Sequence, residues 1–228
     1  PDSVTKRQDI TVNVTDVNEA PTFTSSATFS ANENQTAIGT VVASDVDGDT
    51  LTYSISGSDI TINSSSGVIA FASAPDYETK SSYTATVTAS DGTNSTTQSI
   101  TVNITDVNEA PTFTSSATFN AAENQTVVGT AAATDPEGES VIFSISGSEL
   151  QITSSGVITF NSAPDYETKS SYTASIFAND PDSVTKRQDI TVNVTDVNEA
   201  PAFTSSATFS AAENQTAIGT AIAIDPED

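Results

Sequence analysis

The sequence predicts an all-β protein made of tandem, seven-stranded, Greek-key antiparallel β-sandwiches, and three observations support this prediction. Apolar residues alternate with Thr and Ser along short segments, which is the period of a strand with one buried and one exposed face. Long blocks of sequence recur with a period of 90 residues. Turn residues interrupt the apolar segments, and no segment shows the period of an amphipathic helix.

The recurring blocks set the domain boundaries, because similarity at a fixed period marks tandem units. The string Thr-Asp-Val-Asn-Glu-Ala-Pro occurs at 15–21, 105–111 and 195–201. The predicted division is a final strand and junction of a preceding repeat at 1–19, complete repeats at 20–109 and 110–199, and the first part of a third repeat at 200–228.

The two end pieces are expected to be frayed or held only by neighbouring molecules, because each lacks most of its own sandwich. Residues 1–21 recur unchanged as residues 181–201, so the first piece has the sequence of a repeat's last strand. The chain begins at Pro1 and contains no Met, from which we expect an internal fragment of a longer protein.

The strands of the first complete repeat follow from its alternation. In segment 83–89 the odd positions are apolar or Tyr and the even positions are Thr, and segments 51–55 and 100–104 alternate likewise. Gly-containing turns are expected at 47–48 and 91–92. The expected strands are 22–24, 28–31, 40–44, 51–55, 60–62, 68–71, 83–89 and 100–104. About seven short strands in 90 residues indicate a sandwich.

The charge balance excludes several functions. Thirty acids and six bases give a net charge of −24, which repels nucleic acid and anionic membrane surfaces. The absence of Cys excludes a disulfide framework and thiolate chemistry. No apolar run approaches the length of a membrane span, so we expect no membrane insertion of this segment.

The acids recur at corresponding places in both complete repeats, mostly at the ends of expected strands. Acids gathered at one pole of a sandwich would repel one another, by roughly 4 kcal/mol per close pair at an effective dielectric of 20. Ca²⁺ binds six to eight oxygens and would relieve that repulsion. Spacing alone leaves two interpretations open, a calcium site and ordinary solvated turn acids.

Five motifs in order resemble the cadherin repeat, in a form similar to the cadherin-like modules of large bacterial surface adhesins. They are Ala-x-Glu-Asn, Asp-x-Asp or Asp-x-Glu, Asp-Tyr-Glu, Ala-x-Asp-Gly, and a closing Asp-x-Asn-Glu-Ala-Pro. The resemblance covers both complete repeats and both end pieces. It implies an extracellular location at the bacterial cell surface, a role in adhesion or biofilm attachment, and several Ca²⁺ ions bound between neighbouring repeats of the chain.

The resemblance also implies which residues are ligands at each junction. For the junction of the two complete repeats the implied set is Glu33, Asp76, Glu78, Asp106, Asn108, Glu109, Asp135, Glu137 and Asp180, with the carbonyls of Val107 and Ala110. For the following junction it is Glu123, Asp165, Glu167, Asp196, Asn198, Glu199, Asp225 and Glu227. For the amino-terminal junction it is Asp16, Asn18, Glu19, Asp45, Asp47 and Asp91.

The chain departs from the animal cadherin pattern in three respects. Its linker is one residue shorter before the proline and has Glu in place of the usual Asp. The second repeat has Asp135-Pro136-Glu137 where the first has Asp45-Val46-Asp47. The chain has no Trp, which argues against the strand exchange of homophilic animal cadherins.

Rival interpretations of the same residues are weaker. The run from Asp45 to Asp49 lacks the glycine and glutamate positions of an EF-hand loop. Asp76 and Glu78 could act as a glycosidase pair, but a catalytic site is not usually copied in every repeat, so no enzyme is expected. The tyrosines could stack on sugars, although core packing accounts for them better, and the Asn-x-Ser/Thr triplets occur by chance in a chain so rich in Ser and Thr.

The sequence therefore favours a calcium-rigidified extender. The alternative is an adhesive module that binds polysaccharide or a second copy of itself. A further alternative, a calcium-independent sandwich of the fibronectin type III kind, predicts stability that is indifferent to chelator.

Overall fold

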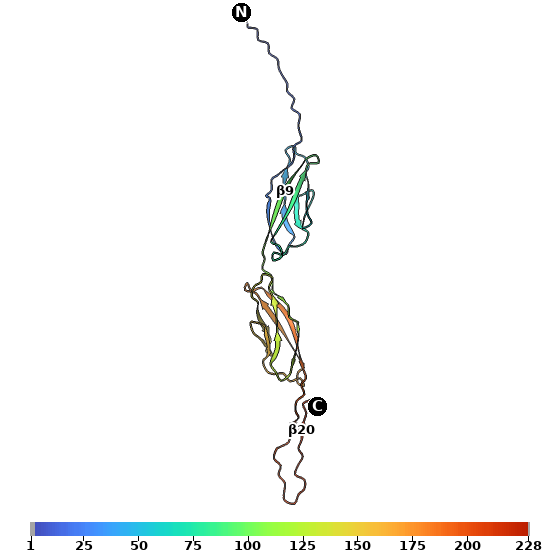
Figure 1. The fold of residues 1–228 in the computed structure, drawn as a ribbon, viewed down its shortest axis with the longest axis vertical. Helices are drawn as coiled ribbons and strands as arrows, with labels where there is room; N and C mark the ends of the chain where they lie inside the picture. Colours follow the sequence, from blue (N-terminus) through green and yellow to red (C-terminus); the bar gives the residue numbers. More distant parts are fainter. Residues whose placement is uncertain (1–2, 228) are drawn as a thin grey trace. The chain divides into compact units, whose positions relative to one another are not determined.

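A computed structural model describes residues 3–227 of the chain. Its regular structure in this range consists entirely of β-strands, β1 to β20, and none of the described residues forms a helix able to cross a membrane. The chain divides into two compact units, Pro1–Val107 and Asn108–Asp228, each of which contains one complete sandwich (Figure 1). The fold class expected from the sequence is confirmed.

The first sandwich has two layers. One layer is the sheet β2-β9-β8-β5, and the facing layer contains the sheet β3-β7-β6 and the short pair β1-β4. Its strands are β1 (Thr22–Phe23), β2 (Thr28–Asn32), β3 (Ala37–Thr40), β4 (Ala43–Ser44), β5 (Thr52–Ile55), β6 (Ile60–Ile62), β7 (Val68–Phe71), β8 (Ser82–Ser90) and β9 (Ser95–Thr105).

The second sandwich repeats this arrangement with the sheets β11-β18-β17-β14 and β12-β16-β15 and the pair β10-β13. Its strands are β10 (Thr112–Phe113), β11 (Thr118–Ala122), β12 (Val127–Thr130), β13 (Ala133–Thr134), β14 (Ile142–Ser146), β15 (Leu150–Ile152), β16 (Val157–Phe160), β17 (Ser171–Asn179) and β18 (Thr185–Thr195). The last two strands, β19 (Ala202–Phe203) and β20 (Ala223–Ile224), pair only with each other.

One pairing in each sandwich is not antiparallel, which corrects the sequence prediction. β2 runs parallel to β9, with Phe29 opposite Val102, and β11 runs parallel to β18. The physical reason is topological. The chain enters a sandwich at one end and leaves at the other, so an early strand, β2 or β11, points the same way as the last strand, β9 or β18.

The expected strand at 40–44 is also interrupted. β3 ends at Thr40 and β4 begins at Ala43. Between them Val41 is fully buried, and its amide donates to the carbonyl of Gly67, 2.9 Å away. Gly67 has a φ of +69°, and a Cβ on it would lie 2.2 Å from the Val41 oxygen, so the close crossing of these two segments requires glycine.

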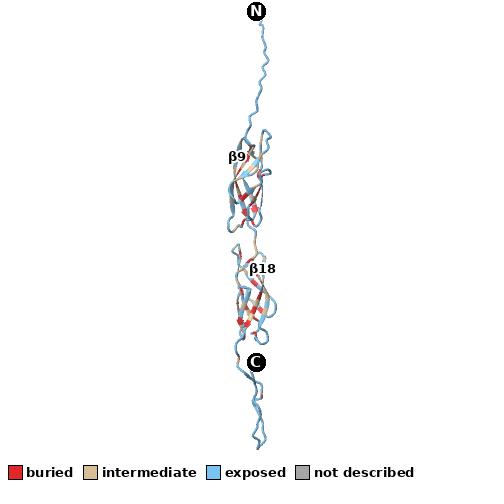
Figure 2. Cartoon of the chain, turned by 90° about the vertical axis from the view of Figure 1, so that its right-hand side faces the viewer, coloured by how far each residue is buried: buried red, intermediate tan, exposed pale blue. Residues whose placement is uncertain are grey.

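The core of each sandwich lies between its sheets, where Figure 2 shows the buried residues in red. In the first sandwich Val87, Ile100 and Val102 come from one sheet and Ile69 from the other. In β9 the buried residues alternate with exposed or partly exposed ones from Ile100 to Ile104, as the period of two predicts. The corresponding residues of the second sandwich form an equivalent core.

The segments outside the two sandwiches have little regular structure. Residues 3–21 contain no strand, and almost all of them are exposed. Residues 5–15 have the same sequence as β18, which forms an eleven-residue strand between β11 and β17. The sequence shared by the two segments therefore forms a strand at 185–195, where β11 and β17 lie on either side, and forms no strand at 5–15. A strand needs partners for its backbone hydrogen-bonding groups.

Candidate metal centre

Each sandwich has acidic residues at both ends. The entry pole is the end at which the chain enters, and it comprises Asn18, Glu19, Asp45, Asp47 and Asp91 in the first repeat and Asn108, Glu109, Asp135, Glu137 and Asp180 in the second. The exit pole is the opposite end, and it comprises Glu33, Asp76, Glu78 and Val107 in the first repeat and Glu123, Asp165, Glu167 and Val197 in the second.

A buried glutamate organises the exit pole. The Glu33 side chain is only 3% exposed, and its two carboxylate oxygens accept the amide protons of Tyr77 and Val107, both at 2.8 Å. This carboxylate therefore joins the Asp-Tyr-Glu turn to the segment that follows β9. Glu123 makes the same two bonds in the second repeat, to the amides of Tyr166 and Val197.

The residue after this glutamate explains why the motif reads Glu-Asn. Asn34 and Asn124 have φ angles of 61° and 62°, in the left-handed region that Asn tolerates better than most residues. Their amides donate to the carbonyls of Pro75 and Pro164, just before the Asp-Tyr-Glu turn. Neither asparagine was among the candidate ligands, although its place directly after a candidate glutamate was a signal.

The Asp-Tyr-Glu turn is closed by its own first residue. Asp76 accepts the amide of Thr79 at 2.9 Å and the hydroxyl of Thr79 at 3.0 Å, and the Lys80 amide donates to the Asp76 carbonyl. Glu33 and Glu78 offer carboxylate oxygens within 4.8 Å of each other. In the second repeat, Glu123, Asp165 and Glu167 offer oxygens that all lie within the same limit.

The entry pole of the first repeat is built around the linker residues Asn18 and Glu19. The Asn18 amide group donates to Asp91 at 2.9 Å, and the Glu19 backbone amide donates to Asp47 at 3.0 Å. Hydrogen bonds from the backbone of Asn94 and Thr93 lower the pKa of Asp91. Asp45, Asp47 and Asp49 offer oxygens within 4.8 Å of one another. Asp49 was not among the candidate ligands.

The entry pole of the second repeat has the same plan but is more buried. Asn108 donates to Asp180 at 2.8 Å, and the Glu109 amide donates to Glu137 at 3.3 Å. The exposed fractions of Asp135 and Asp180 are 8% and 5%. Burial raises the pKa of Asp135, and the neighbouring Glu137 raises it further. The carboxylates here are held close together at a cost in free energy.

The carboxy-terminal junction lies wholly within the second unit. The amide of Glu199 donates to Glu227, and the side-chain amide of Asn124 donates to Glu199. A hydrogen bond between the side chains of Asp225 and Glu227 raises the pKa of Asp225. The linker residue Glu199 is thus bonded to Asn124 of the second repeat, next to the buried Glu123, and to Glu227 of the third.

Four carboxylate oxygens at these places are buried and have no hydrogen-bond partner. They are Asp45 Oδ2, Asp135 Oδ2, Glu137 Oε2 and Glu199 Oε2. A buried charged oxygen without a partner is unfavourable. A set made only of oxygen donors suits a hard cation such as Ca²⁺ and does not suit a metal that prefers nitrogen or sulfur. The donor set at these poles therefore fits calcium.

Some implied ligands are not tied into either pole. Asp16, Asp106 and Asp196 are exposed. Asp16 interacts with Glu19, and Asp196 with Glu167, only by charge repulsion. The Val107 amide binds Glu33, while the ligand roles assigned to the carbonyls of Val107 and Ala110 stay predictions.

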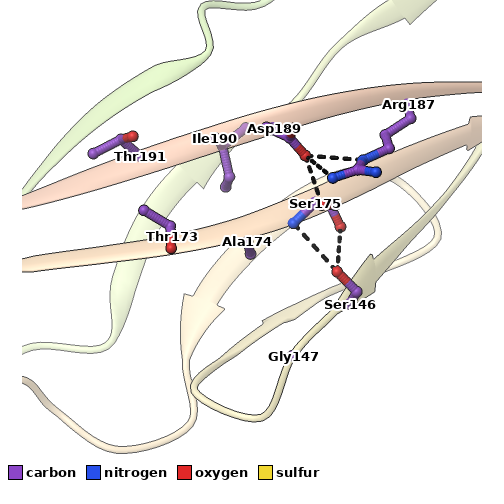
Figure 3. A pocket seen from close by; sticks show the side chains of 9 residues that line it. All are labelled: Ser146, Gly147, Thr173, Ala174, Ser175, Arg187, Asp189, Ile190 and Thr191. Carbon is purple, nitrogen blue, oxygen red and sulfur yellow. Dashed lines mark hydrogen bonds and ion pairs between the residues drawn. The ribbon is translucent and has the colours of Figure 1, made fainter.

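Arg187 of the second repeat is paired with an acid of its own strand. Figure 3 shows a hollow on the outer side of β14, β17 and β18, where the Arg187 side chain is paired with Asp189. Asp189 also accepts the hydroxyl of Ser175 at 2.6 Å, so the arginine charge is already compensated.

Comparisons with known proteins agree with this fold. Residues 25–105 match the family described as Cadherin domain. The chain is 35% identical over 229 residues to human Cadherin EGF LAG seven-pass G-type receptor 2, covering 88% of this chain and 8% of that protein. It is 31% identical to the Drosophila melanogaster Protocadherin-like wing polarity protein stan, covering 86% and 6%. The chain thus spans less than a tenth of the length of these relatives.

A further relative and two solved structures complete the comparison. Chitinase A of Pseudoalteromonas piscicida is 32% identical over 130 residues, which is 56% of this chain and 16% of that enzyme. Mouse Cadherin-23 EC22-24 has a TM-score of 0.57 at 24% identity, covering 92% of this chain and 78% of that one. Human Protocadherin-24 EC1-2 has a TM-score of 0.56 at 24% identity, covering 79% and 100%.

Proposed function

Because residues 25–105 match the cadherin domain and the sandwiches have the fold of cadherin ectodomain repeats, we propose that this chain is a calcium-dependent extender of an extracellular adhesion protein. The observation that carries the proposal is the position of the four buried, unpartnered carboxylate oxygens. Three belong to acids of the entry poles, and the fourth belongs to Glu199 in the last linker.

The carboxy-terminal junction supports ligation by successive repeats. Within one unit, Glu123, Asp165 and Glu167 of the second repeat offer neighbouring oxygens, and Glu199 is bonded to Glu227 of the third. We propose that calcium is held there by both repeats together with the linker.

The junction of the two complete repeats is proposed to work in the same way, because its linker has the same sequence. Val107 is bonded to Glu33 of the first unit, whereas the next two residues, Asn108 and Glu109, are bonded to Asp180 and Glu137 of the second. A single peptide bond therefore joins residues committed to the two poles. Ions ligated by both poles would restrict rotation about this linker, and several ions per junction are proposed.

The mechanism converts ion binding into stiffness. Without calcium, like charges at each pole repel and the repeats hinge at the linker. With calcium, shared ligands hold neighbouring repeats in one arrangement. Binding to the folded state alone stabilises it by about 2.7 kcal/mol at a free calcium concentration one hundred times Kd.

The test is a calorimetric titration with CaCl₂, combined with thermal unfolding and small-angle scattering with and without chelator. We expect calcium to raise Tm and the largest particle dimension, and Glu78→Ala and Asp106→Ala to weaken binding. Stability and dimension that are indifferent to chelator would support a calcium-independent sandwich and refute the proposal. MgCl₂ is the control, since Mg²⁺ requires a tighter octahedral set of ligands.

A second candidate function is an adhesive module that binds polysaccharide or a second copy of the chain. The similarity to a segment of Chitinase A of Pseudoalteromonas piscicida, an enzyme named for a polysaccharide, favours this candidate. A location at a bacterial cell surface is proposed with it. No catalytic role is proposed. Binding to immobilised polysaccharides, and sedimentation at several protein concentrations in calcium, distinguish this module from a passive extender.

A further inference from the structure

Each Asp-Tyr-Glu turn is followed, two positions after its glutamate, by a lysine whose ammonium group pairs with an acid outside the turn. In the first complete repeat, residues 20–109, Lys80 is the single basic residue. It lies two positions after the candidate ligand Glu78. An ammonium group so close to candidate ligands could compete with a metal ion for them.

The ammonium group of Lys80 instead makes two contacts on the side of the sandwich. It lies 2.9 Å from the Asp59 carboxylate and 4.0 Å from the centre of the Tyr83 ring. Asp59 immediately precedes β6, and its carbonyl accepts the amide of Ala72, directly after β7. Tyr83 lies in β8 of the other sheet and packs edge-on against Phe71. Lys80 thus connects the turn to both layers.

The second repeat has the same arrangement with a different acid. The ammonium group of Lys169 lies 2.5 Å from the Glu149 carboxylate and 4.3 Å from the centre of the Tyr172 ring. The longer Glu149 side chain replaces Asp59, yet the lysine occupies the equivalent position. Two of the six bases of this chain therefore make the same pair of contacts.

We propose that Lys80 and Lys169 are positioning residues that hold the Asp-Tyr-Glu turns in their ligand-binding conformation. The start of the first turn is fixed where the Tyr77 amide donates to Glu33, and the Lys80 side chain fixes its end. An ion gains affinity when its ligands are oriented before it binds. This inference rests on the proposed calcium site, but the conformation of the turn can be measured without calcium.

The direction in which calcium affinity changes when the lysine is removed distinguishes a positioning role from a simple effect of charge. Removing a cation from a chain of net charge −24 strengthens binding of Ca²⁺ through general electrostatics. Loss of positioning weakens binding. Because the contacts are partly exposed, we expect a modest effect, a two- to fivefold rise in the calcium Kd, roughly the range of exposed ion pairs and cation–π contacts.

The experiment compares Lys80→Met, Asp59→Asn and the double variant in the full chain. Calcium affinity is measured by calorimetry, and amide hydrogen exchange of residues 76–81 is measured in chelator. Each single variant is expected to weaken calcium binding and to speed exchange of the turn. The double variant should do no more than either single variant, since the two residues act through one contact. Arg187→Met, which removes a charge from β18, is the matched control.

The inference is overturned if Lys80→Met leaves the hydrogen exchange of the turn unchanged. It is also overturned if this variant binds calcium as tightly as the parent, or more tightly. Additive effects of Lys80→Met and Asp59→Asn overturn it as well. If the parent chain binds no calcium, the proposed function fails, and faster exchange in chelator still establishes the positioning of the turn.

Discussion

Replacing the buried glutamate of the second exit pole tests whether this carboxylate organises the pole before any ion binds. In chelator, Glu123→Ala leaves the amides of Tyr166 and Val197 without the oxygens they now reach at 2.8 Å. An amide left unpaired away from water costs about 1–3 kcal/mol. Tyr166 and Val197 are exposed, so water can reach their amides in part and the cost lies at the lower end of this range. The relief from no longer burying a carboxylate offsets part of this cost. We therefore expect a loss of about 1–2 kcal/mol in the free energy of unfolding of the second repeat.

A graded variant sharpens this prediction. Glu123→Gln retains one oxygen acceptor but turns an amide group toward the second backbone donor. It should therefore lower the free energy of unfolding by about half as much as Glu123→Ala does. Glu33→Ala is the matched change in the first repeat and should lower the stability of that repeat by a similar amount.

The measurement is urea unfolding in chelator, followed by hydrogen exchange and mass spectrometry so that each repeat reports separately. Two repeats need not unfold in one transition, so a single probe of the whole chain is insufficient. A loss below about 0.5 kcal/mol for Glu123→Ala would show that its two hydrogen bonds contribute little beyond those of an ordinary surface residue.

Three further outcomes are expected. Gly156→Ala should lower the free energy of unfolding by about 2–4 kcal/mol in thermal melting, because Gly156 has a φ of +92° and the new Cβ would lie 2.3 Å from the Ala131 oxygen. Gly147 has a φ of +111° but no atom within 4 Å of the new Cβ, so Gly147→Ala should cost only about 1 kcal/mol of backbone strain. Asp135→Asn should stabilise the second repeat in chelator, because it removes the charge of a carboxyl group whose pKa is raised by burial and also by the neighbouring Glu137. The same variant should weaken calcium binding in calorimetry, since it removes a proposed ligand. A folded-state pKa above the unfolded one means that the parent gains stability as the pH falls, so the advantage of the variant over the parent should shrink on acidification.

The sequence predicted the strands well because the period of two is a local signal. The limits of the expected strand at 60–62 match β6, and those at 68–71 match β7. The break at Val41 was not predicted, because it depends on the close crossing with Gly67, 26 residues away along the chain. The parallel pairing of β2 with β9 was likewise not visible, since apolar alternation is the same for either strand direction.

The candidate site shows the same division. Glu33 could be chosen from its motif, but its two bonds to backbone amides exist only because the fold brings Tyr77 and Val107 to one carboxylate. Tyr83 was expected to be a core residue, and its contact with Lys80 was not predicted. The acid that pairs with Lys80, Asp59, lies 21 positions earlier in the chain. Contacts of this kind require knowledge of which strands are neighbours.

The identity of residues 5–15 with β18 has a consequence for how such a chain reaches its native state. Two chemically identical segments can compete during refolding for the same position between β11 and β17, and occupation by the wrong copy gives a swapped intermediate that must unfold before it can correct itself. Consecutive repeats differ here, because β9 begins Ser-Thr-Thr-Gln-Ser where β18 begins Thr-Lys-Arg-Gln-Asp. Sequence divergence between neighbours disfavours the exchange between the two copies that meet first, and leaves the identical copies separated by a whole sandwich.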